Sequence, residues 1–180
     1  MTMSNRLARL SGVTVALAVL LAVCGCDRPD YESPVVNQGG PVIDIAQLPD
    51  IEQTTTQMVD LMERVSREVT RLVPAAEPWE WTRDQQGFGC KQESTGQDGV
   101  KRYLRSLTSQ HALTDSEWDR VFPAVRQLAS DAGLTEIAAP QNQPGSHDVR
   151  ITSDDGRTLM FGSREATVIS ADIACRRAAP

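Results

Sequence analysis

The beginning of the chain limits which residues can belong to a folded domain. Two arginines, Arg6 and Arg9, occur there without an acidic residue, and an apolar run from Val13 to Val23 follows them. This order is typical of a secretion signal. As a helix the run would be about 16 Å long, against a hydrocarbon core of about 30 Å, so it is too short to span a membrane. We therefore expect residues 1–25 to act as a signal peptide.

The cysteine after the apolar run predicts how this signal is processed. Residues 23–26 read Val-Cys-Gly-Cys and resemble the lipobox, in which an aliphatic residue lies three positions before a cysteine and a small residue directly precedes it. Cys26 follows Gly25, whereas Cys24 follows the β-branched Val23 and fits the peptidase less well. By this resemblance, cleavage between Gly25 and Cys26 leaves Cys26 with a diacylglyceryl group, and its new amino group can be acylated. The alternative is an ordinary signal peptide with two incidental cysteines.

A lipidated Cys26 would hold the mature protein on the extracytoplasmic face of the cell membrane. At about 0.8 kcal/mol per buried methylene, one acyl chain binds a membrane marginally and two or three bind it stably. The chain after the signal carries 16 basic and 24 acidic residues. Its acidity gives no electrostatic attraction to anionic lipids and argues against nucleic acid as a partner. The membrane contact is therefore expected to come from the lipid alone.

A linker is predicted between the anchor and the domain. Residues 27–49 contain four prolines and the pair Gly39-Gly40, and they show neither helical nor strand periodicity. A flexible chain of this length has an end-to-end distance of roughly 25 to 30 Å. We therefore predict a lipidated N-terminus and tether over residues 26–49, a domain over residues 50–176 and a short tail over residues 177–180.

Two segments of the domain have the periodicity of amphipathic helices. In residues 50–73, apolar residues recur at spacings of three and four, charged residues fall on the other side, and Pro74 ends the pattern. Residues 114–133 begin with Thr-Asp-Ser-Glu, a capping box, and end at Gly133, which favours the left-handed cap. Pro123 lies inside the second segment, and we expect a kink or a preceding short turn there.

The other segments favour β-strands. Residues 79–82 alternate with Trp79 and Trp81 on one side, and we expect the residues around Cys90 to pair with this strand. Residues 99–113 fit either a helix or a strand. Further strands are expected at residues 134–138, 148–152, 157–161 and 167–175, with a hairpin turn at residues 154–156. Two amphipathic helices packed on an antiparallel sheet make an α+β domain.

The cysteines of the domain predict one disulfide. Cys90 and Cys175 remain once Cys24 is removed and Cys26 is lipidated, and an exported protein with one leftover pair most simply joins it. A metal site would need more ligands than these two cysteines with the widely separated His111 and His147 provide. The absence of a CxxC spacing argues against a redox role.

Several of these features occur together in one known family. The lipobox cysteine, the Pro- and Gly-containing tether, the first helix, the tryptophan strand leading to Gly89 and Cys90, the helix at Trp118 and the ending HDVRITSDDGRTLMFGS with Cys175 are similar to the mycobacterial LppA-like lipoproteins. The resemblance covers about residues 50–176. It implies a lipid anchor and a disulfide-linked α+β domain at the cell envelope, and it implies no enzyme activity.

Motifs for catalysis are sparse. Ser146, His147 and Asp148 adjoin in sequence, which does not supply the converging geometry of a triad, and we interpret them as the turn before a strand. Asp154 and Asp155 beside Gly156 lack the rest of a calcium loop and are interpreted as turn residues. No phosphate-binding loop or nucleophile elbow occurs, and we expect no cofactor and no metal.

Two hypotheses for the function follow. The first is a noncatalytic envelope lipoprotein that binds a small molecule, lipid, wall component or protein, with Trp79, Trp81 and Trp118 as candidate ligand-lining residues, although core packing is the simpler role for all three. The second is an envelope hydrolase built on carboxylates such as Glu80, Glu93 and Asp148. The second hypothesis requires two of these carboxylates to converge in a cleft with separated pKa values.

Overall fold

The computed structural model describes residues 44–92 and 95–180. The predicted signal peptide, Gly25, Cys26 and the predicted tether up to residue 43 lie outside these residues, as does Glu93. The described elements follow one another in this order: η1 (Ile45–Gln47), α1 (Ile51–Leu72), η2 (Pro74–Ala76), β1 (Trp79–Thr82), β2 (Gln86–Lys91), β3 (Asp98–Tyr103), β4 (Ser106–Ser109), α2 (Asp115–Asp131), β5 (Glu136–Gln143), β6 (Ser146–Thr152), β7 (Arg157–Ser163) and β8 (Thr167–Arg176).

The described strands form one antiparallel sheet of eight strands, and β8 pairs with three of the others. One edge of β8 pairs with β7, which is followed by β6 and β5. The other edge pairs with two strands in succession, because β4 pairs with its first half and β3 with its second half. Outside these, β1 pairs with β4 and β2 pairs with β3. The chain therefore forms a long hairpin. Strands β1 and β2 make one arm, strands β3 and β4 make the other, and each arm is interrupted between its two strands. We call this the interrupted hairpin.

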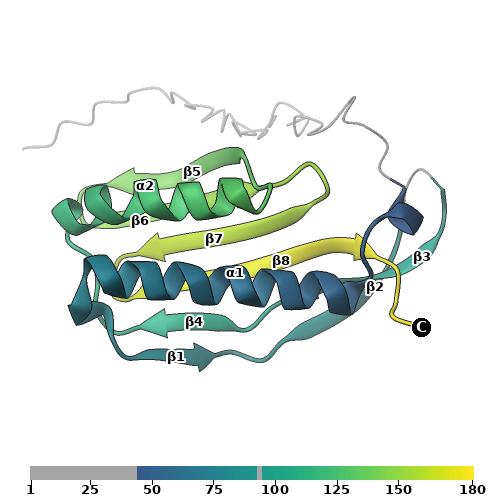
Figure 1. Ribbon diagram of the computed structural model, residues 1–180, viewed down its shortest axis with the longest axis horizontal. Coiled ribbons are helices and arrows are strands. Elements are labelled where there is room, and N and C mark those ends of the chain that lie inside the picture. The colour runs from purple at the N-terminus through teal and green to yellow at the C-terminus, as the bar shows by residue number, and fades with distance from the viewer. Residues whose placement is uncertain (1–43, 93–94) are drawn as a thin grey trace, which may run out of the picture. The chain divides into compact units, whose positions relative to one another are not determined.

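Both helices lie on the same face of the sheet (Figure 1). Every second residue of β7 and β8 points toward them and is buried, including Leu159, Phe161, Ile169 and Ala171. The predicted apolar stripe of α1 is buried against these strands from Met58 to Val69. The core thus lies between the helices and one face of the sheet, and the opposite face is covered by no element of the part of the chain that the structure describes.

Local sequence signals set the ends of both helices. Asp50 caps α1 by accepting hydrogen bonds from the backbone N–H groups of Glu52 and Gln53, both at 2.9 Å. Thr114 and Glu117 form the predicted capping box of α2. Gly133 follows the helix with a φ of 82°, the left-handed conformation that glycine adopts freely. Pro123 lies inside α2, which is helical from Asp115 to Asp131.

Two expectations about the strands need correction or completion. The strand around Cys90, β2, does not pair with the Trp79 strand; it pairs with β3, and β1 pairs with β4. The ambiguous residues 99–113 form most of β3 and all of β4. The pairing and the strand assignment have one cause. Strands β3 and β4 pair directly with β8, so β1 and β2 are left as their outer neighbours.

Residues on either side of the predicted domain, residues 50–176, make contacts with it. Ile45, placed in the predicted tether, is 4% exposed, and its N–H donates to the Gln92 side chain at 3.1 Å. At the other end, the Arg177 carbonyl accepts a hydrogen bond from the N–H of Ile51 at 3.0 Å. Residues 44–49 and Arg177 are therefore part of the folded unit. Ile45 contacts the Gln92 side chain of the β2–β3 turn, and the Arg177 carbonyl accepts a hydrogen bond from the first turn of α1.

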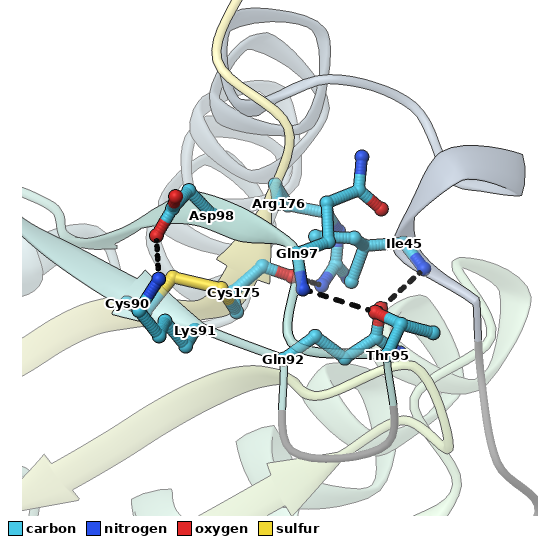
Figure 2. The surroundings of a disulfide bond; sticks show 9 residues. All are labelled: Ile45, Cys90, Lys91, Gln92, Thr95, Gln97, Asp98, Cys175 and Arg176. Carbon is cyan, nitrogen blue, oxygen red and sulfur yellow. Dashed lines mark hydrogen bonds and ion pairs between the residues drawn. A yellow bond between two sulfur atoms is a disulfide. The ribbon is translucent and has the colours of Figure 1, made fainter.

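The predicted disulfide joins β2 to the end of β8. Cys90 and Cys175 are bonded, with their Cα atoms 5.9 Å apart. Figure 2 shows the bond beside the ion pair of Lys91 with Asp98, close to the point where Ile45 reaches Gln92. The bond therefore ties the outer strand β2, which pairs only with β3 among the described strands, to the centre of the sheet. Among the described helices, none is long and apolar enough to cross a membrane.

Candidate functional site

Trp118, one of the predicted lining residues, lies in the core. Its side chain is 4% exposed, and its ring is stacked between neighbours, with ring centroids 4.5 Å from His147 and 4.9 Å from Phe161. His147 in turn contacts oxygen atoms of Asp115 and Asn142, each at 2.9 Å. Trp118 thus packs α2 against β6 and β7.

The other two tryptophans face the helices. The indole N–H of Trp79 donates to the hydroxyl of Thr70 in α1 at 3.0 Å. The guanidinium of Arg105 lies over the ring of Trp81, 5.6 Å from its centroid. Both rings are half-buried and pack against the edge of the core. The sheet therefore does not bring the three tryptophans together at one site.

The carboxylates considered for a hydrolase are far apart. Glu80 lies on β1 and Asp148 on β6, and the strands β4, β8 and β7 lie between them. Four strand spacings of about 4.8 Å correspond to about 19 Å. Glu93 lies outside the described residues. Glu80 and Asp148 therefore cannot act together on one bond.

The adjacent residues Ser146, His147 and Asp148 do not form a triad. The interpretation of these residues as the turn before a strand is wrong, because all three belong to β6 and the turn lies at residues 144–145. Successive side chains of a strand point to opposite faces, so the three cannot converge. Asp154 and Asp155 lie in the turn between β6 and β7, as predicted, but Asp155 also pairs with Arg157 and with the buried Arg176. Both groups contribute to the structure of the domain.

A different place in the fold has the form of a binding site. A hollow of about 410 Å³ opens where the interrupted hairpin passes along β8, within the roughly 300–1,000 Å³ typical of small-molecule sites. By strand register Tyr103, Met160 and Ser170 belong to the face of the sheet that the helices leave uncovered. The residues that line the hollow are Arg83, Asp84, Gln86, Tyr103, Leu104, Ser106, Met160, Ser170 and Ala171.

The interruption of the hairpin explains why the sheet is hollowed here. Arg83 begins the β1–β2 connection with a φ of 61°, which is uncommon for a residue other than glycine. Across from it, Leu104 follows β3, and its N–H donates a backbone hydrogen bond to the Ala171 carbonyl at 2.9 Å. Pairing resumes at Ser106, opposite Thr82. The missing ladder positions leave a gap, which buried Leu104 and Ala171 line from below.

The polar side chains around this hollow have no hydrogen-bonding partner in the part of the chain that the structure describes. Within these ranges, no hydrogen bond or ion pair involves the side chains of Arg83, Asp84, Gln86, Tyr103, Ser106 and Ser170. Ser106 is 2% exposed as a residue. The side-chain N and O atoms that are buried without a partner in the described ranges all belong to arginines, so the Ser106 hydroxyl keeps contact with the hollow and can hydrogen-bond water or a bound molecule. The hollow therefore offers several donors and acceptors to a ligand.

An aromatic pair stands at one side of the hollow. Tyr103 and Phe88 are each 46% exposed, and their rings meet edge to face with centroids 5.9 Å apart. Next to Tyr103 across the sheet lies Asp172. Burial raises the pKa of the Asp172 carboxyl, although the Thr158 hydroxyl and the Arg150 charge act in the opposite direction.

The local sequence does not predict this hollow. Its lining comes from β1–β2, β3–β4, β7 and β8, which meet only through the sheet. The one local signal is the polar segment of residues 83–85 between β1 and β2, which is typical of an ordinary loop. Tyr103 belongs to the segment that fits either a helix or a strand. The sequence of this segment therefore does not predict that Tyr103 is exposed on a strand.

Two solved structures are similar to this chain. A crystal structure of the lipoprotein LppA from Mycobacterium tuberculosis is similar, with a TM-score of 0.59 and 11% identity over 72% of this chain and 79% of that chain. A DUF4853 family protein from Actinomyces odontolyticus gives a TM-score of 0.47 and 10% identity over 77% of this chain and 75% of that chain. At 11% identity, the similarity to LppA from Mycobacterium tuberculosis concerns the fold alone.

A protein-family model also matches this chain. A comparison with curated proteins finds no match. The model of the LppA family, described as a lipoprotein confined to pathogenic Mycobacterium, matches residues 43–179. This range begins just before the first described residue and ends after Arg177, in agreement with the limits of the folded unit. The chain therefore belongs to the LppA family of lipoproteins.

Proposed function

We propose that the protein is a membrane-anchored binding protein of the cell envelope, held by lipid on Cys26 at the extracytoplasmic face, and that it acts without catalysing a reaction. The ligand would occupy the hollow beside Tyr103 on the uncovered face of the sheet. The observation that carries this proposal is the set of six polar side chains that line the hollow without a hydrogen-bonding partner among the described residues.

Two further features support binding over catalysis. The candidate carboxylates Glu80 and Asp148 are separated by three strands, so a paired acid and base is not available from them. Among its described lining residues, the hollow contains one carboxylate, Asp84, in an exposed loop. Its other polar groups are hydroxyls, an amide and a guanidinium, which can donate hydrogen bonds to a ligand.

The experiment is native mass spectrometry of the protein extracted in detergent from its own host. The wild-type protein is compared with Ser170→Phe, which places a ring in the hollow, and with Ser130→Phe, a matched change on the exposed side of α2. We expect a bound molecule on the wild type and on Ser130→Phe, and a loss of that molecule on Ser170→Phe. Equal occupancy of all three proteins, or bare protein in every case, would contradict the proposal.

A further inference from the structure

Resting on the proposed function, the chemistry of the hollow also indicates a class of ligand. We propose that the hollow binds an uncharged carbohydrate, with one sugar ring against Tyr103 and its hydroxyl groups toward Gln86, Ser106 and Ser170.

The hydroxyl groups of a carbohydrate complement the polar side chains of the hollow. Each hydroxyl of a sugar both donates and accepts hydrogen bonds. The lining offers both roles, because Ser106, Ser170 and the Tyr103 hydroxyl each donate and accept, and the Gln86 amide supplies two donors and an acceptor. None of these groups is hydrogen-bonded to another described residue. A ligand without hydroxyls or amides would leave them unpaired, which strongly disfavours its binding.

Tyr103 also presents an aromatic surface to a sugar ring. A pyranose or furanose ring has a face of C–H groups, which carry a slight positive charge, and an aromatic ring has a negative face. Tyr103 is 46% exposed and Phe88 contacts it edge to face at 5.9 Å. Phe88 is itself contacted by Lys101, whose Nζ lies 5.8 Å from the ring centroid. The Tyr103 ring is therefore open to a ligand on its exposed side and is contacted by Phe88 on another.

Charge around the hollow also bears on the ligand. Among the described lining residues, Arg83 is the one cation and Asp84 the one anion, and both are exposed. These opposite charges favour neither a strongly anionic nor a strongly cationic ligand. Among the described lining residues, the apolar ones are Leu104, Met160 and Ala171. An acyl chain would have to displace water from the surrounding hydroxyls without replacing their hydrogen bonds. Because most of the surface that lines the hollow is apolar, a neutral ligand that carries both hydroxyl groups and C–H faces fits this composition.

The test titrates the detergent-extracted wild-type protein with three soluble neutral trisaccharides, maltotriose, mannotriose and arabinotriose. Isothermal titration calorimetry gives the affinity, and saturation-transfer difference NMR identifies the sugar protons in contact with the protein. We expect at least one of the three to bind at one site per chain, with the strongest saturation transfer to C–H protons of one ring face.

The variants assign the site. Tyr103→Ala should weaken the affinity about tenfold or more, as expected when an aromatic contact is removed from a binding site. Tyr103→Phe keeps the ring and should bind within a few-fold of the wild type. Ile137→Ala, an exposed change on the edge strand β5, is the control and should leave the affinity unchanged. Circular dichroism and thermal unfolding of each variant exclude a loss of fold as the cause.

The outcomes separate this inference from the proposed function. No binding of any trisaccharide, or equal binding by Tyr103→Ala and the wild type, overturns the carbohydrate assignment. If native mass spectrometry nevertheless finds another molecule that Ser170→Phe excludes, such as a peptide or a lipid, the proposed binding function stands without the carbohydrate. If no molecule is excluded by Ser170→Phe, both proposals fail.

Discussion

At the scale of single residues, Asp155 joins two parts of the domain that are distant in sequence. Its carboxylate contacts the Arg157 Nε at 2.9 Å and the Arg176 guanidinium at 3.3 Å. The side chain of Arg176 is 1% exposed, and it also donates to the Asp155 carbonyl at 2.7 Å. The turn between β6 and β7 is thereby attached to the end of β8. A charge as deeply buried as Arg176 depends on this partner.

Removal of the Asp155 charge should therefore destabilise the domain. Asp155→Asn is expected to lower the free energy of unfolding by about 3 kcal/mol, near the lower end for breaking a buried ion pair, because the Asp155 side chain keeps 23% exposure. Urea unfolding followed by tryptophan fluorescence measures the change. The adjacent Asp154→Asn is the matched control, because Asp154 is exposed in the same turn. Equal effects of the two substitutions would contradict this role of Asp155.

The same residue predicts how stability depends on pH. Burial alone would raise the pKa of the Asp155 carboxyl, but hydrogen bonds from Ser153 and Arg157 and the charges of Arg157 and Arg176 outweigh it and lower the pKa. The stabilisation is therefore complete above the aspartate pKa of the unfolded chain, about 4, and is lost as the pH falls through the lower folded pKa. The stability difference between the wild type and Asp155→Asn should shrink below about pH 4; a difference that grows there would contradict this role of the carboxylate.

At the scale of elements, the hairpin of β2 and β3 depends on contacts with the end of β8. The Cys90–Cys175 bond closes a loop with a sequence separation of 85 residues. Its contribution in the chain-entropy model is about 4 to 5 kcal/mol. Replacing both cysteines with serine should lower the free energy of unfolding by up to this amount, measured by urea unfolding. An unchanged unfolding midpoint would show that β3–β8 pairing alone holds the hairpin.

A glycine in this hairpin should also be sensitive to substitution. A Cβ atom at Gly99 would lie 2.5 Å from the Arg176 carbonyl oxygen and 2.8 Å from the Cys175 sulfur. Because neither atom can withdraw without moving the strand, Gly99→Ala should cost about 1–3 kcal/mol in unfolding free energy. A Cβ atom at Gly89, on the partner strand, would meet no described atom within 4 Å. Gly89→Ala is therefore the control, and its unfolding midpoint should stay close to that of the wild type.

The helices were predictable from the sequence because their signals are local. The stripe from Met58 to Val69 and the capping box at Thr114 act within a few residues of one another, and both are present in the structure. The partner of β2 was not predictable, because strand pairing depends on which segments β8 accepts along its edge. The hollow beside Tyr103 arises from that same pairing and from the break at Leu104. It therefore has no signature in the local sequence.

At the scale of the whole molecule, the proposed lipid on Cys26 determines where the domain acts. A Cys26→Ala variant should lose the lipid mass in intact-protein mass spectrometry and should be released from the membrane or remain unprocessed. The reason is that the acidic mature chain has no electrostatic attraction of its own to anionic lipids. Cys24→Ala is the matched control and should be lipidated and retained normally. Normal membrane retention of Cys26→Ala would refute the assignment.

The central claim is that the uncovered face of the sheet binds a ligand in the hollow beside Tyr103. Hydrogen–deuterium exchange tests it most directly, by comparing the protein extracted from its host with the same protein stripped of bound molecules and refolded. We predict slower exchange in the ligand-bound protein at residues 83–86 and 103–106, with no change in α1 or β5. Equal exchange in both samples, or protection confined to α1 or β5, would contradict the claim.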